Sequence, residues 1–291
     1  MKTLVSVSAF ALTLALTAPA HALLVEYPNF NDTSGLTFVG SATTQGSPAV
    51  LHLTSPLEGQ SGAAYSTTAV TLGSGATFST QFQFRITNPG GIDPADGFTF
   101  VLAKDTTGLG GAGGGLGYQG VGNSVAIEFD TFNNGSGDGN SSNHVGIDIN
   151  GSLNSAALTN VYGLSECHLA NAATSGCMAN GDIWTALIEY DGTTQLLNVI
   201  LTDPTEGTSF NAITDYLVDI ESALDSGGTA YVGFTSATGS GYENHDILNW
   251  RFSDSATLPP PTDTGVPEPL TLTLFGAGLA GVAFGRRKLR R

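Results

Sequence analysis

The sequence predicts an all-β protein, a jelly-roll sandwich of two antiparallel sheets, and three features of the chain support this fold class. Apolar and polar residues alternate with a period of two along many short stretches. Clusters of Gly, Asn, Asp and Ser separate these stretches, and only Asp215–Leu224 favours a short helix. Because period-two alternation places one face of a strand in a core, many such strands joined by polar turns indicate two packed sheets.

The individual strands follow from where this alternation occurs. Four stretches alternate clearly, and they cover Phe78–Ile86, Phe98–Leu102, Val125–Phe129 and Val145–Ile149. Four later stretches are apolar on both faces, and they cover Trp184–Tyr190, Leu196–Leu201, Tyr231–Thr235 and Ile247–Phe252. Trp184 and Trp250 lie in these later stretches, so we expect both side chains in the core. Residues 23–254 contain no linker and are expected to form one domain.

The first 22 residues are expected to be a secretory signal peptide rather than part of the fold. Lys2 precedes an apolar run from Leu4 to Leu16, and Ala20-His21-Ala22 provides the small-x-small pattern of a cleavage site. A run of this length is too short and wrongly flanked for a stable membrane span. Residues 1–22 are therefore expected to be removed from the mature chain.

The carboxyl end contains a linker followed by a second export signal. Residues 255–265 are rich in Pro and Thr, and consecutive prolines form a stiff segment that cannot join a sheet. Residues 266–291 contain a Pro-Glu-Pro motif, an apolar run from Leu270 to Gly285 and a basic end. A helix over that run would reach roughly 24 Å, slightly short of a ~30 Å hydrocarbon core.

This order of residues resembles the PEP-CTERM sorting signal of Gram-negative bacteria. The resemblance implies recognition by exosortase-type sorting machinery, with the tail removed afterwards. A permanent single-span anchor, oriented by its basic end, is the alternative that the same physics permits. Either interpretation predicts export through the inner membrane to the cell envelope or the extracellular space.

The charge of residues 23–265 is strongly acidic. They contain twenty-four Asp and Glu but only three basic residues, Arg85, Lys104 and Arg251. Such a field repels nucleic acid and anionic lipid headgroups, whereas it attracts divalent cations. We therefore expect no nucleic-acid partner.

The two cysteines, Cys167 and Cys177, are expected to form a disulfide. An even, closely spaced pair in an exported protein is typical of a disulfide rather than of a metal site. Closing this small loop would stabilise the fold by roughly 2–3 kcal/mol.

The segment Val125–Gly151 carries the residues that point to metal chemistry. Alternation directs Glu128 and Asp130 to one face of a strand, about 6.5–7 Å apart. Two carboxylates held this close repel each other unless a positive charge lies between them. The next strand begins at His144, which would lie beside both acids if the two strands form a hairpin. The connecting loop adds three oxygen donors, Asn134, Asp138 and Asn140.

The donor set in this segment suits two kinds of cation. Oxygen ligands suit calcium, and one imidazole among carboxylates suits manganese or another transition metal. The run Glu-x-Asp-Thr-aromatic-x-Asn, followed by His-x-Gly-x-Asp-x-Asn, is similar to the metal-binding stretch of legume (L-type) lectins. The resemblance covers residues 24–254 and implies a concanavalin-like sandwich that binds carbohydrate in a calcium-dependent way.

Carried onto this sequence, the resemblance assigns two metal sites. The transition-metal ligands would be Glu128, Asp130, Asp138 and His144. The calcium ligands would be Asp130, the carbonyl of Phe132, Asn134 and Asp138. One position departs from the family pattern, because its second bridging aspartate falls at Gly139 and Asp138 comes one residue early. Either the loop shifts to deliver Asp138, or Asn140 substitutes, or the transition-metal site is weak or absent.

The resemblance also implies a sugar site. Ala95-Asp96 matches a strand entry with a cis peptide whose aspartate accepts sugar hydroxyls. Gly114 lies in a matching glycine run, where a backbone amide donates to the ligand. Asn134 would bond the sugar, and the ring of Phe132 would stack on it. Residues 240–244, including Gly241 and Tyr242, match the loop that selects the sugar, which would be a glycan or exopolysaccharide.

Other functions are less well supported by the sequence. Glycoside hydrolases on the same fold carry a second catalytic glutamate three residues after the aspartate, where this chain has Asn133. The chain is therefore not expected to be an enzyme. A structural envelope or matrix protein that keeps the fold without binding sugar remains as an alternative. The remaining mature-region histidines, His52, His168 and His245, lack ligand-like neighbours in the sequence and are expected to be structural.

Overall fold

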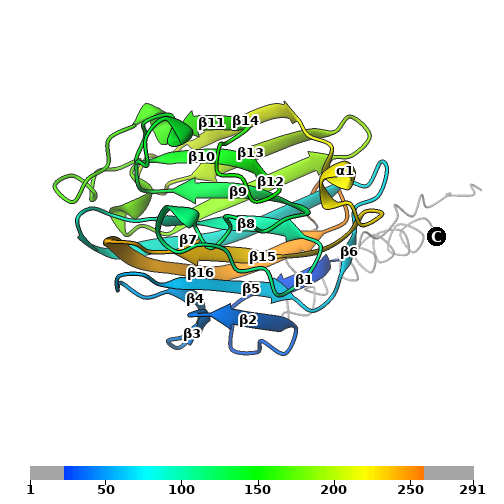
Figure 1. Ribbon diagram of the computed structural model, residues 1–291, viewed down its shortest axis with the longest axis horizontal. Helices are drawn as coiled ribbons and strands as arrows, with labels where there is room; N and C mark the ends of the chain where they lie inside the picture. The colour runs from blue at the N-terminus through cyan, green and yellow to red at the C-terminus, as the bar shows by residue number, and fades with distance from the viewer. Residues whose placement is uncertain (1–22, 259–291) are drawn as a thin grey trace, which may run out of the picture. The chain divides into compact units, whose positions relative to one another are not determined.

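The computed structural model describes residues 23–258 (Figure 1), and the predicted signal peptide and sorting tail lie outside them. Two eight-stranded antiparallel sheets make up these residues, as predicted. The first sheet runs in the order β14 (Ser209–Leu217), β13 (Leu196–Thr202), β12 (Trp184–Asp191), β7 (Phe78–Gly91), β16 (Gly241–Ser253), β4 (Val50–Thr54) and β3 (Thr43–Gln45), with β1 (Leu23–Tyr27) also paired to β16. The second runs in the order β11 (Ala157–Asn160), β10 (His144–Ile149), β9 (Ser124–Asp130), β8 (Gly97–Ala103), β15 (Thr229–Ala237), β5 (Ser61–Ser66) and β2 (Leu36–Gly40), with β6 (Val70–Thr71) also paired to β15.

The core lies between the two sheets and is rich in aromatic rings. Phe82 on β7 packs against Phe129 and Phe234 of the second sheet, at centroid distances of 5.7 and 5.0 Å. Trp184 and Trp250 are fully buried, which confirms their predicted place in the core. Edge-to-face contacts of this kind add to the hydrophobic stabilisation from burying the rings.

Two details of the sequence prediction are wrong. The predicted helix over Asp215–Leu224 is a helix only from Ile220 to Leu224 (α1), and its amino end is capped by Asp219. Its first part continues β14, because pairing with β13 decides the conformation there. The sequence predicted strands with two apolar faces over β12 and β13, but only one face of each is buried in the core. Their residues alternate between buried and mostly half-buried positions. One sheet face thus remains partly open to solvent.

In the second sheet, the ends of four neighbouring strands, β10, β9, β8 and β15, lie side by side. Asp130 at the end of β9 pairs with Gly97 on β8 and with His144 on β10, and Gly97 pairs with Ala237 on β15. Gly97 has φ +126°, and a side-chain methyl there would lie 2.3 Å from the carbonyl oxygen of Phe129. Only glycine fits this close approach. The loops at this end of the sheet therefore meet at one place.

Short 3₁₀ turns lie in the loops and connections after β8. They are η1 (Gly113–Gly115), η2 (Ser136–Asp138), η3 (Val161–Gly163) and η4 (Met178–Asn180). Within residues 23–258, no helix is long and apolar enough to cross a membrane. The short transmembrane helix predicted within residues 266–291 lies outside the described residues.

Candidate metal and sugar site

A buried cluster of two carboxylates and one imidazole lies at the end of the β9–β10 hairpin. Register pairs His144 with Asp130 and Gly146 with Glu128, so all three predicted ligands share one face. One ligand atom from each lies within 4.8 Å of the others. Gly146 makes room for this cluster, because a methyl group there would lie 2.2 Å from Oε1 of Glu128. The hairpin predicted from alternation is confirmed.

His144 presents an unpartnered nitrogen to the two acids. Its Nδ1 lies 3.2 Å from the carbonyl oxygen of Ser141, which only accepts, so Nδ1 carries the proton. Its Nε2 lies 3.3 Å from Oε1 of Glu128 and has no hydrogen-bond partner among the described residues. A metal-ligating histidine characteristically donates its other N–H to a carbonyl in this way. The imidazole is thus oriented as a ligand.

The electrostatics of the cluster also fit a cation. Glu128 and Asp130 are each 2% exposed, and Asp138 is 8% exposed. Burial, together with the charges of Glu128 and Asp138, raises the pKa of Asp130 well above its usual value. Burial also opposes ionisation of Glu128, but the neighbouring imidazole of His144 and the hydroxyl that Ser155 donates outweigh it and lower that pKa. Buried acids of this number are stable when a positive charge lies among them.

Among residues 23–258, no lysine or arginine supplies that positive charge. Residues 23–265 contain three basic residues, and each is engaged elsewhere. Arg85 lies 4.0 Å from Asp246, Lys104 donates to the carbonyl of Asp225, and Arg251 donates to Gln81. The chain's own residues therefore leave an excess of negative charge at this end of the second sheet.

The loop after β9 turns Asp138 inward despite its early position in the sequence. Asp138 ends the 3₁₀ turn η2, which Gly135 and Gly139 flank with positive φ angles. Its Oδ2 accepts the backbone N–H of Asn134, and its charge acts on Asp130. Asn140, the alternative donor, is exposed. Asp138 is thus buried near Asp130, but it is not among the three residues whose ligand atoms lie within 4.8 Å of one another, so its role as a ligand stays a prediction.

Asp148 is a buried acid that the ligand prediction leaves out. It lies on β10 with no exposed surface, and burial and the charge of Glu128 raise its pKa to about 10. The signal for it is present in the sequence, because Asp148 follows His144 by four residues and so shares its face. With this pKa, Asp148 is protonated near neutral pH and adds no negative charge beside Glu128.

The predicted sugar contact Asp96 lies next to this cluster. The peptide between Ala95 and Asp96 is cis, as the family resemblance implies. The Asp96 backbone is fixed on both sides, since its carbonyl accepts the N–H of Thr131 and its N–H donates to Ala237. Its side chain is 3% exposed, and Oδ2 has no hydrogen-bond partner among the described residues. Burial, then the charges of Glu243 and Asp138, raises the Asp96 pKa to about 7.

Three further loops converge on Asp96. A methyl group on Gly114 would lie 2.5 Å from Oδ1 of Asn134, so these two predicted sugar contacts touch. Gly113 donates its N–H to the carbonyl of Thr238, and Gly239 lies against Oδ2 of Asp96. Beside Gly114 and Asn134, a hollow of about 430 Å³ opens toward residues 151–154. Gly114 and Asn134 line this hollow, whereas Asp96 lies outside its lining and is linked to the glycine loop through Gly239, which lies against both Asp96 and Gly113.

Comparison with known proteins places this geometry in a family. The sequence profile of the legume lectin domain matches residues 23–267. The chain belongs to the legume lectin family. The PEP-CTERM protein-sorting motif matches residues 265–291, which confirms the second resemblance.

Individual legume lectins are similar over most of the chain. The lectin alpha chain of Lablab purpureus is 30% identical over 266 residues, which cover 86% of this chain and 87% of that one. The structure of basic winged bean lectin with Tn-antigen superposes with a TM-score of 0.66 at 30% identity, covering 81% of this chain and 98% of that one. A metal-free form of lectin I-B4 from Griffonia simplicifolia also gives a TM-score of 0.66, at 29% identity and with coverages of 80% and 99%. These proteins are lectins, and the family is one of carbohydrate-binding proteins rather than enzymes.

In this legume lectin domain the remaining predicted sugar contacts lie around the same region. Phe132 is half-buried, directly after the Thr131 that holds Asp96. Gly241 packs closely on the turn before Asp96, and the ring of Tyr242 lies against Gly90. The neighbour that touches the Asp96 carboxylate is Gly239, which the sequence did not single out. The roles of Gly241 and Tyr242 as sugar contacts stay predictions.

A buried polar network behind the legume lectin site was also missed. Glu243 accepts the hydroxyl of Thr131 and lies 3.2 Å from Nε2 of His245, and neither Glu243 nor His245 is exposed. Nδ1 of His245 lies 2.6 Å from the hydroxyl of Thr54. His245 is therefore structural, as predicted, although its partners come from distant parts of the chain. The network ties β16 to the segment that carries Asp130 and Phe132.

Proposed function

We propose that this legume lectin domain is a calcium-dependent carbohydrate-binding protein. One observation supports it above the others. The buried carboxylate of Asp96 has an unpartnered oxygen where three other loops converge, beside an acid–histidine cluster that has no lysine or arginine partner among the described residues. A sugar offers adjacent hydroxyl donors, which suit such an oxygen, and the acid cluster suits a cation.

Each of the predicted contacts has a distinct task toward the sugar. Asp96 accepts hydroxyl hydrogens, while the amide of Gly114 and the side chain of Asn134 donate to sugar oxygens. The half-buried ring of Phe132 covers an apolar face of the sugar ring. Hydrogen bonds to a charged group contribute about 1.5–3 kcal/mol each, so Asp96 is expected to dominate the affinity.

The metal-binding residues would fix the loops that carry these contacts. Glu128, Asp130, Asp138 and His144 would hold a manganese-type ion. Asp130, the carbonyl of Phe132, Asn134 and Asp138 would hold calcium. Bound cations would supply the positive charge that neutralises the buried acids. Because Asn134 serves both the metal and the sugar, sugar binding is expected to require the cation.

The proposed place of action is the bacterial cell envelope or extracellular matrix. Residues 1–22 would direct export, and the PEP-CTERM motif would be handled by exosortase-type machinery. A single legume lectin site is expected to bind weakly, so many copies displayed together would retain a glycan or exopolysaccharide through multivalency.

A glycan array with and without a chelator tests the proposal. Galactose and N-acetylgalactosamine are the first probes, because the Ulex europaeus lectin UEA-II and the Bauhinia forficata lectin were solved with these sugars. We expect binding in calcium and manganese, loss of binding in EDTA, and recovery when calcium is restored. Absence of cation-dependent binding to every glycan would instead favour a structural matrix protein.

A further inference from the structure

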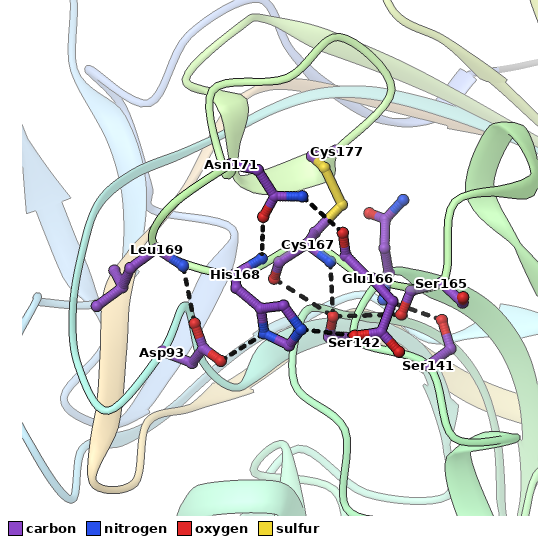
Figure 2. A network of polar contacts seen from close by, with 11 residues as sticks. Asp93, Ser141, Ser142, Ser165, Glu166, Cys167, His168, Leu169, Asn171 and Cys177 are labelled. Carbon is purple, nitrogen blue, oxygen red and sulfur yellow. Dashed lines mark hydrogen bonds and ion pairs between the residues drawn. A yellow bond between two sulfur atoms is a disulfide. The ribbon is translucent and has the colours of Figure 1, made fainter.

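A disulfide-closed segment outside the sugar site touches both of its flanks (Figure 2). Cys167 and Cys177 are joined, as predicted, and the segment from Ser165 to Cys177 is here called the clasp. At one side, Ser142 accepts the N–H of Cys167 at 2.8 Å, two residues before His144. At the other side, His168 and Leu169 contact Asp93, three residues before Asp96. The clasp therefore joins the metal flank to the sugar flank.

His168 makes the contact on the sugar flank with both of its ring nitrogens. Nδ1 lies 2.6 Å from Oδ2 of Asp93, and Nε2 lies 2.6 Å from Oε2 of Glu166. Both partners are carboxylates, so each nitrogen donates and the ring is an imidazolium. The hydrogen bonds that His168 donates to Glu166 and Asp93 raise its pKa. Among residues 23–258, these two are the charged groups that act on the ring.

The turn that His168 holds packs directly on Ser240 and Gly241, which lie in the loop predicted to select the sugar. The N–H of Ile92 donates to the carbonyl of Ser240, and a methyl group on Gly241 would lie 2.4 Å from the carbonyl oxygen of Asp93. Asp93 also accepts the N–H of Leu169 at 2.8 Å through its second oxygen. A shift of Asp93 would thus move residues on both sides of the Asp96 carboxylate.

The clasp is anchored firmly enough to transmit such a constraint. The buried Asn143 donates to the carbonyl of Gly176 at 2.9 Å and accepts the N–H of Met178 at 2.9 Å. Within the clasp, Asn171 accepts the N–H of His168 and donates to the carbonyl of Glu166. The imidazolium is therefore presented from a fixed backbone rather than from a free loop.

We propose that His168 is a positioning residue of the sugar site, because its imidazolium ties Asp93 to the disulfide-closed clasp and so fixes the turn that carries Asp96. The inference rests on the proposed function for its effect on sugar affinity, but its effect on the turn is independent of sugar. The imidazolium holds two carboxylates, whereas neutral imidazole has one N–H and releases one of them. The turn is thus held below the raised pKa and loosened as pH rises through it.

The test compares the full chain with its His168→Gln variant, in calcium and manganese. We expect faster amide hydrogen exchange over residues 91–97 in the variant at pH 6. We also expect affinity for N-acetylgalactosamine to fall about fivefold, the lower end of typical coupling between sites. From pH 6 to pH 9, the protection factors of these amides in wild type should fall toward those of the variant. The protection factors of the variant should show no such fall with pH. Ser175→Ala is the matched control, because Ser175 lies in the clasp but bonds Thr205 and Glu206 instead.

The outcomes separate this inference from the proposed function. If residues 91–97 are protected from amide hydrogen exchange as well in His168→Gln as in wild type at every pH, the inference is overturned. This holds whether or not the protein binds sugar. If wild type binds no sugar but the exchange changes as expected, the positioning of the turn stands and the proposed function fails. A Cys167→Ala/Cys177→Ala double variant should loosen the same turn, and an unchanged turn would contradict the clasp.

Discussion

Two histidine–carboxylate clusters in the same domain have opposite chemical characters. His144 is fully buried with Glu128 and Asp130, and its Nε2 lacks a hydrogen-bond partner among the described residues. The side chain of His168 is 45% exposed, and both of its nitrogens are bonded to carboxylates. The residue types are the same, yet one cluster is incomplete and the other is complete.

The difference shows that two properties distinguish a candidate ligand site from a structural contact. They are the burial of the charged groups and the number of their polar atoms that have hydrogen-bond partners. At the buried cluster, acids outnumber bases and solvent cannot compensate the charge, so the cluster suits a cation. At the exposed cluster, water screens the extra carboxylate and the imidazolium needs no further partner. Replacing one acid by its amide should therefore stabilise the metal-free protein at the buried cluster, whereas replacing the imidazolium of His168 should destabilise it at the exposed cluster.

The largest expected effect is that of Asp130→Asn. Asparagine keeps the bond from the Phe132 N–H, at 2.7 Å in the wild type, but removes one buried negative charge. We expect metal affinity to fall more than about a hundredfold and sugar binding to be lost, since a ligand's neighbours alone cost about 10–100-fold. Metal analysis and titration calorimetry measure both. Without metal, the variant should melt above wild type, because the folded chain no longer buries a carboxyl group that must either take up a proton or face like charges.

Asp203→Asn is the control for a buried acid outside the cluster. Burial opposes ionisation of Asp203, but hydrogen bonds from Thr205 and Gly176 outweigh it and lower its pKa. The Asp203→Asn variant should have a lower melting temperature than wild type. Calcium should still raise the melting temperature of this variant. Equal melting of wild type with and without calcium would contradict the comparison between clusters.

Asp96→Ala is expected to have the next largest effect, and it should change sugar affinity without changing metal binding or stability. Losing hydrogen bonds to a charged group should weaken sugar binding by at least about a hundredfold, or ~3 kcal/mol. Thermal stability should change little, because the buried carboxylate has an unpartnered oxygen and contributes little to folding. Calorimetry with N-acetylgalactosamine, paired with a melting curve and metal analysis, measures these effects. Sugar binding that survives in this variant would refute the site.

The parts of the site that the sequence predicted depend on local periodicity. Alternation fixed the faces of Glu128 and Asp130, and because the next strand along the chain begins at His144, a hairpin was the natural pairing. The cis peptide at Asp96 and the disulfide followed from a resemblance and from cysteine spacing. The core aromatics followed from the same alternation. Local patterns thus predicted the sheets and the centre of the metal cluster.

Contacts between distant loops could not be predicted in this way. Asp93 and His168 are 75 residues apart, and Thr131 and Glu243 are 112 residues apart. Their pairing depends on which loops the two sheets bring together, and no local period encodes that. The inward turn of Asp138 likewise depends on two residues with positive φ, Gly135 and Gly139, whose effect becomes clear only in the folded loop.

A smaller effect is expected from Gly146→Ala, which tests the shape of the buried cluster. The added methyl group would lie 2.2 Å from Oε1 of Glu128, so the carboxylate must move away from His144. We expect a loss of about 1–3 kcal/mol in stability and weaker binding of the transition metal, with calcium affected less. Gly122→Ala is the matched control, because nothing lies within 4 Å of its added methyl group. Equal metal affinity in both variants would argue against Glu128 as a ligand.

The smallest expected effect is the pH dependence of stability at the exposed cluster. The folded-state pKa of His168 is raised, so its contribution is fully present below the unfolded value of about 6.5 and is lost as pH rises through the raised pKa. Because the ring is well exposed, that contribution should stay below about 1 kcal/mol, or ~2–4 °C in melting temperature. The wild-type advantage over His168→Gln should therefore be present at pH 6 and shrink toward pH 9. Since all other titrating groups are common to both chains, only their difference in melting temperature needs to be followed, in saturating calcium and manganese. A difference that grows with pH would mean that neutral imidazole, rather than imidazolium, holds Asp93, and the contrast between the two clusters would then have to be redrawn.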